Sequence, residues 1–316
     1  MVEATEGHYR IVAKAIAEGR VVPLIGAGVN LCGRPSGARW QLGRYLPSSA
    51  ELAAYLAKAF EYPAGELKDL LRVSQFAAVM TGSGPLYEEL HRLFDVDYEP
   101  TRVHTLLAAV PEFLRGQAVI RYPLIVTTNY DDALERAFTA AGEEFDLVCY
   151  IADGQHRGKF THVPPDDAPR VIERPNEYDA LSLSQRAVIL KIHGAINRHD
   201  PDGDSYVITE DHYIDYLTRT DISNLIPVTL AARLRRSHFL FLGYSMADWN
   251  LRVILYRIWG EQALTYRSWA IQLDPKPLEE RFWSKRGVEI LHVALEDYVE
   301  ALASRLGEVR HSRAAS

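Results

Sequence analysis

One apolar segment runs directly into a glycine-rich turn, and this junction constrains the fold of the chain more than any other feature. Residues 21–25 (VVPLI) are typical of a buried strand and are followed at once by Gly26-Ala27-Gly28. A strand that ends in such a turn is how open α/β sheets present backbone N–H groups to a phosphate. Leu31 stands where a complete G-x-G-x-x-G motif has its third glycine, so a turn without a ligand is an equal interpretation of this stretch alone.

Short apolar strands alternate with helical patterns along much of the chain. Apolar runs predict five further strands, at 124–128, 188–192, 238–242, 269–273 and 288–293. Strands that alternate with helices indicate a parallel sheet with both faces covered. We therefore expect an α/β fold, a Rossmann-like parallel sheet, in a single domain spanning 1–316.

A mostly helical stretch interrupts this alternation after the first strand. Apolar residues recur at helical spacing within 50–60, 66–80, 85–94 and 101–114. We expect residues 36–117 to form a helical insertion, or subdomain, that lies over the sheet. Elsewhere the polar, proline-containing segment 150–185 is expected to be irregular with short strands, and the tail at 307–316 to be frayed.

Composition narrows the classes of function. The net charge is −7, which gives no general electrostatic case for nucleic-acid binding. Cys32 and Cys149 belong to no C-x-x-C pair, so we expect no thiolate zinc site. No signal peptide is recognisable and no apolar run approaches the roughly 18 residues of a membrane span, so we expect a cytoplasmic protein with no membrane partner.

Polar or flexible residues directly follow four of the predicted strands. These residues are Asn30 with the glycine turn, Asn129 with Asp131, His193 with Gly194, and Gly243 with Ser245. The carboxyl ends of parallel strands lie at the same edge of a sheet, and ligands bind at that edge. The four strand ends are therefore predicted to converge on one pocket.

Four ordered motifs carry a resemblance to a known family. They are Gly26-Ala27-Gly28-Val29-Asn30, Thr127-Thr128-Asn129-Tyr130-Asp131, Lys191-Ile192-His193-Gly194 and Gly243-Tyr244-Ser245. Together they resemble the motifs of the Sir2 (sirtuin) family, which binds NAD on a Rossmann-like fold and cleaves its nicotinamide–ribose bond. The run at 241–252 (FLGYSMADWNLR) resembles the bacterial branch found in anti-phage defence, whose members act mainly as NAD glycohydrolases.

The resemblance implies a site for NAD, which would be the substrate. The expected NAD-binding residues are Gly26, Ala27, Gly28, Asn30, Thr128, Gly243 and Ser245, and the expected catalytic residues are Asn129, Asp131 and His193. The glycine turn would donate backbone N–H groups to the pyrophosphate. Gly243 and Ser245 would lie near the adenosine.

Each expected catalytic residue also has a structural interpretation. His193 suits a general base because its unperturbed pKa lies near the working pH, but a strand-end histidine can also be satisfied by backbone groups. Asn129 could bind the ribose or orient a water through its amide, and it also suits the N-cap of a helix at 133–141. Asp131 could lie near the nicotinamide or ribose, or stabilise the positive end of that helix, a role for which Asp132 competes.

Two departures from the family pattern argue against peptide deacylation. Typical sirtuin deacylases carry a four-cysteine zinc module that two distant cysteines cannot build, and Asn30 stands where the family usually has serine. We therefore predict an NAD⁺ glycohydrolase without zinc, acting as a defence effector that depletes cellular NAD. The alternatives are a protein deacylase or ADP-ribosyltransferase, and a non-catalytic nucleotide-binding subunit of a larger complex.

An NAD hydrolase that is always active would poison its own cell, so the prediction implies control. The chain has no G-x-x-x-x-G-K-[ST] loop of an ATPase sensor, which favours a separate sensor or regulatory chain. A homo-oligomer is expected, and nucleic acid only as an indirect signal. Asp248 suits a helix N-cap and Arg252 its partner four residues later, so we expect both to be structural.

Overall fold

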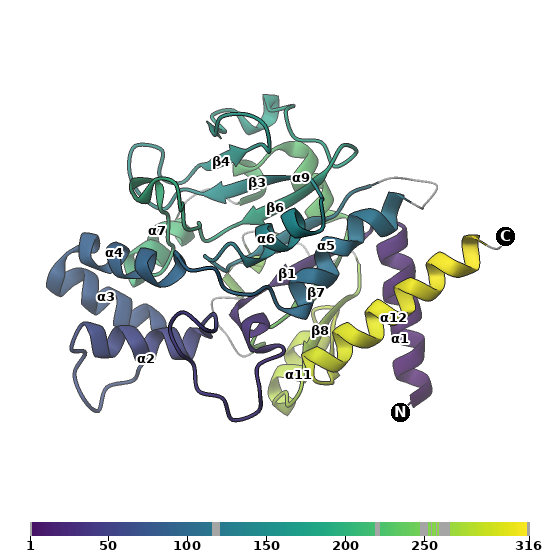
Figure 1. The fold of residues 1–316 in the computed structure, drawn as a ribbon, viewed down its shortest axis with the longest axis horizontal. Coiled ribbons are helices and arrows are strands. Elements are labelled where there is room, and N and C mark those ends of the chain that lie inside the picture. The colour runs from purple at the N-terminus through teal and green to yellow at the C-terminus, as the bar shows by residue number, and fades with distance from the viewer. Residues whose placement is uncertain are drawn as a thin grey trace.

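A sheet lies at the centre of the computed structural model, which describes residues 2–115, 121–218, 222–246, 252, 253, 255, 256, 258 and 266–314. In these residues nine strands form one sheet in the order β5-β4-β3-β6-β2-β1-β7-β8-β9 (Figure 1). The strands are β1 (Val21–Ile25), β2 (Leu124–Thr127), β3 (Phe145–Tyr150), β4 (Phe160–Val163), β5 (Arg170–Val171), β6 (Ala187–Lys191), β7 (His238–Leu242), β8 (Ser268–Gln272) and β9 (Val288–His292).

All six predicted strands are present, and they pair in parallel with one another. The sheet extends further than expected, because β3 pairs in parallel with β6 and then carries β4 and β5 in antiparallel order. Strand β3 was not predicted, because its buried face includes a charged residue, Asp146, which interrupts the apolar alternation. The Nε2 atom of His162 on β4 lies 2.9 Å from Asp146 Oδ1, so the buried carboxylate is paired.

The described helices include the predicted ones at 50–60, 66–80, 85–94, 101–114 and 133–141, within four residues at each end, and three helices between 210 and 235 that were not predicted. The described helices are α1 (Val2–Ala17), α2 (Ser49–Ala59), α3 (Leu70–Thr81), α4 (Ser83–Phe94), α5 (Arg102–Arg115), α6 (Ala133–Ala140), α7 (Glu210–Thr218), α8 (Ile222–Leu225), α9 (Val228–Arg235), α11 (Pro277–Ser284) and α12 (Leu295–Ala314). The helix for which Asp248 was expected to be the N-cap falls largely outside the described residues. The expectation of a frayed tail from residue 307 is wrong as far as Ala314, because α12 continues to that residue.

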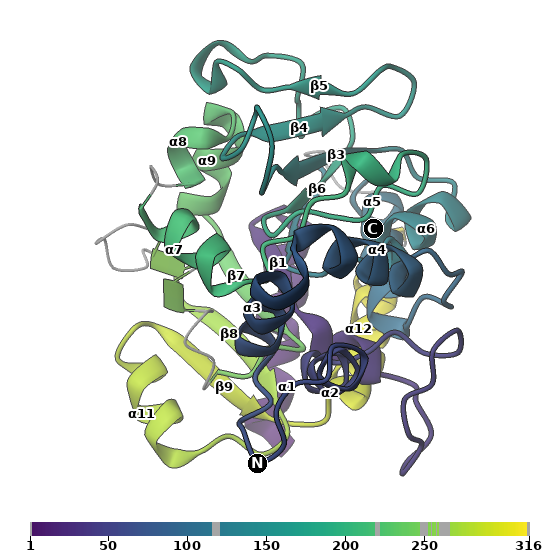
Figure 2. The same cartoon turned by 90° about the vertical axis from the view of Figure 1, so that its left-hand side faces the viewer.

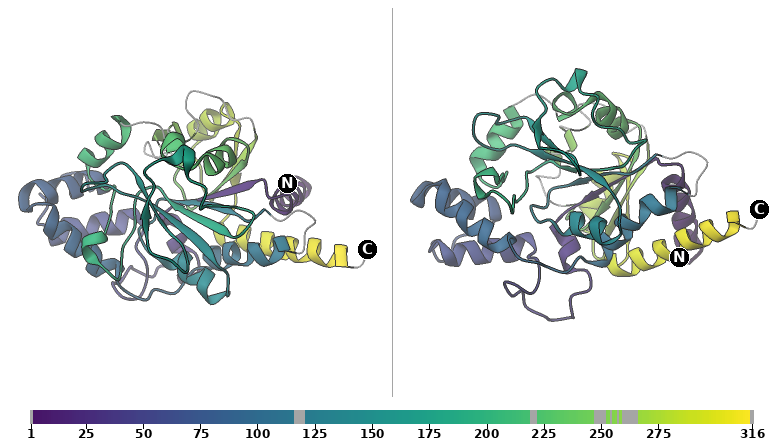
Figure 3. Two further views of the ribbon diagram at one scale, coloured as in Figure 1. Left: turned by 90° about the horizontal axis from the view of Figure 1, so that it is seen from above. Right: turned by 45° about the horizontal axis from the view of Figure 1, so that its top comes forward.

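Helices cover both faces of the sheet. Apolar residues of α1, α5, α6 and α12 form one core against it, and residues of α7, α9 and α11 form a second core on the opposite face. Figure 3 shows α12, in yellow, and α9, in green, on opposite sides of the strands. Within the described residues, every helix is either too short or too polar to cross a lipid bilayer.

Three helices of the expected insertion stand apart from these layers. Helices α2, α3 and α4 pack on one another around a third apolar core, and Figure 2 shows α3 in front of the ends of the strands. Tyr130 and Tyr206, which come from segments that follow strands, complete that core. Helix α5, although it lies within residues 36–117, packs with α6 and α12 in the core on the sheet.

Candidate functional site

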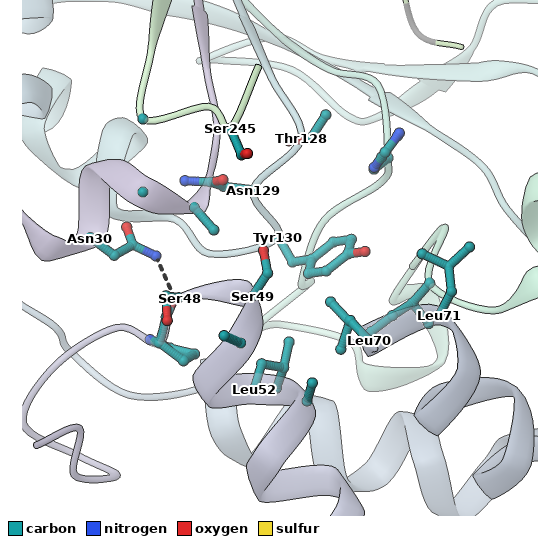
Figure 4. A pocket seen from close by; sticks show the side chains of 18 of the residues that line it. Asn30, Ser48, Ser49, Leu52, Leu70, Leu71, Thr128, Asn129, Tyr130 and Ser245 are labelled. Atoms are coloured by element: carbon teal, nitrogen blue, oxygen red, sulfur yellow. Dashed lines mark hydrogen bonds between the residues drawn. The ribbon is translucent and has the colours of Figure 1, made fainter. Parts of the chain in front are cut away.

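A cavity of about 590 Å³ lies where β1, β2, β6 and β7 end. Nine of the ten expected site residues line it: Ala27, Gly28, Asn30, Thr128, Asn129, Asp131, His193, Gly243 and Ser245. Figure 4 shows Thr128, Asn129 and Ser245 on one side, and Ser49, Leu70 and Leu71 from the insertion on the other. The cavity is thus a cleft between the sheet edge and the α2–α4 insertion, in the size range of small-molecule sites.

The glycine turn makes a close backbone approach to the end of β7. The Gly28 N–H donates to the Gly243 carbonyl over 2.9 Å, and a Cβ on Gly28 would lie 2.5 Å from that carbonyl oxygen. Gly243 has a φ of +69°, and a Cβ on it would lie 2.3 Å from the Val29 nitrogen. Both positions therefore require glycine for reasons of packing that hold without any ligand.

The same contacts limit the turn as a phosphate site. The Gly26 N–H donates to the Leu242 carbonyl over 3.1 Å, and the Gly28 N–H already donates to the Gly243 carbonyl. Of the three N–H groups expected to bind a pyrophosphate, that of Ala27 has no acceptor among the described residues. Gly26 is the expected site residue that does not line the cavity, since the ring of Tyr244 covers it.

Two asparagine amides in the cavity wall have unused hydrogen-bonding atoms. Asn129 is 7% exposed, and neither its Oδ1 nor its Nδ2 has a partner in the described part of the chain. Its backbone N–H donates to Thr127 Oγ1, whereas the N-cap position of α6 belongs to Asp132. Asn30 donates from Nδ2 to the Pro47 carbonyl over 2.9 Å, and its buried Oδ1 has no partner among those residues (Figure 4).

A buried amide with no partner is costly, so it indicates a binding group whose partner is a ligand. Leaving a buried polar atom unpaired costs about 1–3 kcal/mol in most proteins. The N-cap interpretation of Asn129 does not account for its amide, because that amide makes no bond to α6. The amides of Asn30 and Asn129 can supply both donors and acceptors to hydroxyl groups in the cavity.

Asp131 lies both at the start of α6 and in the wall of the cavity. Its Oδ1 accepts the Ala133 N–H over 3.1 Å at the start of α6, and the residue also lines the cavity. Burial raises the pKa of its carboxyl, and the nearby Lys191 ammonium opposes that shift. Asp132 faces away from this arrangement, since its Oδ1 accepts a hydrogen bond from Arg198 over 2.9 Å.

His193 lies between two tyrosines that the sequence analysis did not identify. The rings of Tyr213 and Tyr216, both on α7, pack edge-on against the imidazole at centroid distances of 5.4 and 5.6 Å. The Tyr213 hydroxyl lies 3.4 Å from Nδ1 of His193. Helix α7 therefore fixes the orientation of this ring, and its aromatic pattern could not be linked to His193 without the tertiary structure.

Other residues of the cavity were also missed. Tyr244 lies between Gly243 and Ser245 in the motif, and its hydroxyl is 2.6 Å from Thr128 Oγ1, which joins the ends of β7 and β2. The N-terminal turns of α2 and α3 contribute Ser48, Ser49, Lys68 and Asp69. These insertion residues follow no strand, so the strand-end pattern gave no signal for them.

Arg252 contacts α11 rather than the cavity. Its guanidinium lies 3.3 Å from the Glu279 carboxylate and 4.0 Å from the centroid of the Phe282 ring. Asp248, its expected partner, lies outside the described residues. In the part of the chain that the structure describes, no three His, Cys, Asp or Glu side chains gather as a metal site would require.

The fold and the site define a class: an α/β protein whose parallel strands end at a polar cavity under a helical insertion. The SIR2-like domain family matches residues 123–291 of the 316, and the chain belongs to that family. The resemblance drawn from the four motifs is thereby confirmed.

Two curated proteins are similar to the chain. It is 23% identical over 290 residues to "Defense-associated sirtuin 2" of Bacillus subtilis, covering 90% of this chain and 24% of that protein. It is 31% identical over 193 residues to "NAD(+) hydrolase ThsA" of Acinetobacter baumannii (strain 532279), covering 60% of this chain and 31% of that protein. The chain thus spans less than a third of either relative.

A solved structure of a mutant Sir2 homologue in complex with 2'-O-acetyl ADP ribose also matches. Its TM-score is 0.37 and its identity 16%, over 95% of this chain and 96% of that one.

Proposed function

We propose that the protein is an NAD⁺ glycohydrolase that forms nicotinamide and ADP-ribose, and that it acts in bacterial defence by depleting NAD. The observation that carries the proposal is the buried amide of Asn129, which has no protein partner among the described residues and stands in the cavity beside Asp131 and His193. Membership of the SIR2-like family and the likeness to a protein named an NAD(+) hydrolase support it.

The reaction needs little acid assistance, because nicotinamide leaves as a neutral base. The bond between the ribose anomeric carbon and the pyridinium nitrogen breaks, and its electron pair stays on nitrogen. A water oxygen then bonds to the anomeric carbon and releases a proton. The transition state resembles an oxocarbenium ion, as in other glycoside hydrolyses.

Three residues of the cavity wall would assist the reaction. The Asn129 amide would hold a ribose hydroxyl or the attacking water, and His193 would accept the proton that is released. The Asp131 carboxyl would lie close to the developing positive charge, which a carboxylate at that place would stabilise.

The remaining residues would hold the rest of NAD. The Ala27 N–H and the Asn30 amide lie in the wall built by the glycine turn, and Ser245 follows β7 in the same cavity. We propose that the pyrophosphate lies along the turn and the adenosine beside Gly243 and Ser245. The cavity volume suits one dinucleotide.

Control of the activity belongs to the same proposal. A constitutive NAD hydrolase would deplete its own cell, so a homo-oligomer and a separate sensor or regulatory chain are proposed to hold it inactive until infection. Both similar proteins are longer than this chain. Nucleic acid would enter only as an indirect signal.

Nicotinamide release from NAD⁺ by the purified protein tests the function. Wild type is expected to release nicotinamide, and His193→Ala and Asn129→Ala to lower kcat by about 100-fold or more. His199→Ala serves as the matched control, because His199 is exposed and outside the cavity wall. NAD binding without turnover, even with candidate partners present, would favour a non-catalytic subunit instead. Release that both variants retain would contradict the proposed site.

A further inference from the structure

A lysine lies almost fully buried next to the proposed catalytic residues, and nothing so far gives it a role. Lys191 ends β6, two residues before His193, and is 1% exposed. Its Nζ donates to the backbone carbonyl of Asp131 and, over 2.7 Å, to Oε1 of Glu135. One ammonium group therefore joins the end of β6 to both ends of the segment from Asp131 to Glu135, which contains the start of α6.

Stability alone does not explain a charge at this position. The residues that precede Lys191 on β6 are apolar and fully buried, so an apolar side chain would suit the site. Buried ion pairs are often no better for stability than apolar side chains of similar volume. The Lys191–Glu135 pair is better explained by the segment of chain that its hydrogen bonds hold in place.

These hydrogen bonds fix the segment between β2 and α6. The bond to the Asp131 carbonyl holds one peptide group, and the bond to Glu135 holds the first turn of α6. Asp131 Oδ1 accepts the Ala133 N–H within the same segment. Asn129 lies two residues earlier, and its amide has no side-chain or backbone partner among the described residues, so the position of that amide depends on the backbone around it.

We propose that Lys191 is a positioning residue, which holds the Asn129–Asp131 segment at a fixed distance from His193, two residues beyond the end of β6. The inference rests on the proposed function, because it concerns the geometry of that same site. Strand β6 pairs in parallel with β2 up to Thr127 and Lys191, so the ammonium extends the link between the strands beyond the last paired residues.

The charges around Lys191 are consistent with an ammonium that stays protonated. Burial alone lowers the pKa of this lysine, but Glu135, Cys149 and Asp131 together raise it above its usual range. A protonated Lys191 can hold both acceptors at once, since an ammonium has three donors and no acceptor.

The test compares Lys191→Met with Lys159→Met. Lys159 also pairs with a glutamate, Glu173, but it lies outside the cavity, so its variant controls for loss of a lysine–glutamate pair. Three quantities are measured on the full chain: amide hydrogen exchange of residues 128–135, kcat for nicotinamide release, and the Kd of ADP-ribose.

Lys191→Met is expected to accelerate exchange in 128–135 by about 10-fold or more while β1 and β7 exchange as in wild type. Its kcat is expected to fall about 10- to 100-fold, because small misplacements of reacting groups have effects of that size. The Kd of ADP-ribose should change by less than about 3-fold, since the turn and the β7 end remain intact. Lys159→Met should change none of the three.

Unchanged exchange in 128–135, or exchange that rises equally throughout the sheet, would overturn the inference. If wild type itself releases no nicotinamide, the proposed function fails, and the exchange of 128–135 still decides the role of Lys191. If Lys191→Met does not fold, Glu135→Leu takes its place. That change removes the Glu135 acceptor of Nζ altogether; faster exchange confined to 128–135 in Glu135→Leu supports the inference, and unchanged exchange there overturns it.

Discussion

Replacing Asn129 by leucine should stabilise the free protein while it removes the activity. Leucine has nearly the shape of asparagine, and the side chain is buried in the cavity wall. In the free protein neither amide atom has a hydrogen-bond partner among the described residues. Asparagine therefore loses its hydration on folding and gains nothing in return until a ligand binds.

The size of the effect follows from the desolvation of one polar group. Each buried unsatisfied donor or acceptor costs about 1–3 kcal/mol, and replacing a polar group by an apolar one of the same shape removes that cost. Because the amide borders a cavity, we count one group rather than two. The free energy of unfolding of Asn129→Leu should then exceed that of wild type by about 1–3 kcal/mol.

Urea unfolding of the ligand-free protein measures this difference, and nicotinamide release measures the activity. Asn30→Leu is the matched control, because Asn30 gives up a 2.9 Å hydrogen bond to the Pro47 carbonyl. It should be less stable than Asn129→Leu by at least about 1 kcal/mol. An Asn129→Leu protein that is less stable than wild type would refute the reasoning, since it would show that the amide is already paired.

Two further predictions concern stability. Gly28→Ala places a Cβ 2.5 Å from the Gly243 oxygen and should lower the free energy of unfolding by about 2–4 kcal/mol, through overpacking and a lost hydrogen bond. Gly84→Ala is the control, because Gly84 has open space around it and its replacement should leave the stability unchanged. Equal urea midpoints for the two variants would contradict the close approach. Burial lowers the pKa of His104 to about 3, below the usual 6.5 of an unfolded chain, so the unfolded state binds the proton first as pH falls. His104 should therefore lower the free energy of unfolding by about 2 kcal/mol between pH 7 and pH 5. Urea titrations at the two pH values should show a smaller loss of stability for His104→Gln than for wild type. An identical loss in both proteins would contradict a buried neutral imidazole.

The sequence by itself determined the architecture and the edge at which the site lies. Five of the six predicted strands, β1, β2, β6, β7 and β8, carry dense apolar runs and are buried along almost their whole length, whereas β9, at the edge of the sheet, is partly exposed. Because parallel strands end at one edge, the residues after β1, β2, β6 and β7 had to meet there, and the cavity wall contains them. Local pattern suffices for such features, since strand identity and direction depend on nearby residues.

Only the tertiary structure decided which groups are available and which are already used. The Gly26 and Gly28 N–H groups are consumed by carbonyls of β7 and of the residue after it, more than 200 positions later in the chain. Asp146 sits in a strand because His162 pairs with it, and Lys191 is buried because Glu135 and the Asp131 carbonyl accept its bonds. A hydrogen bond depends on distances between segments that are remote in sequence, and those distances exist only once the chain has folded.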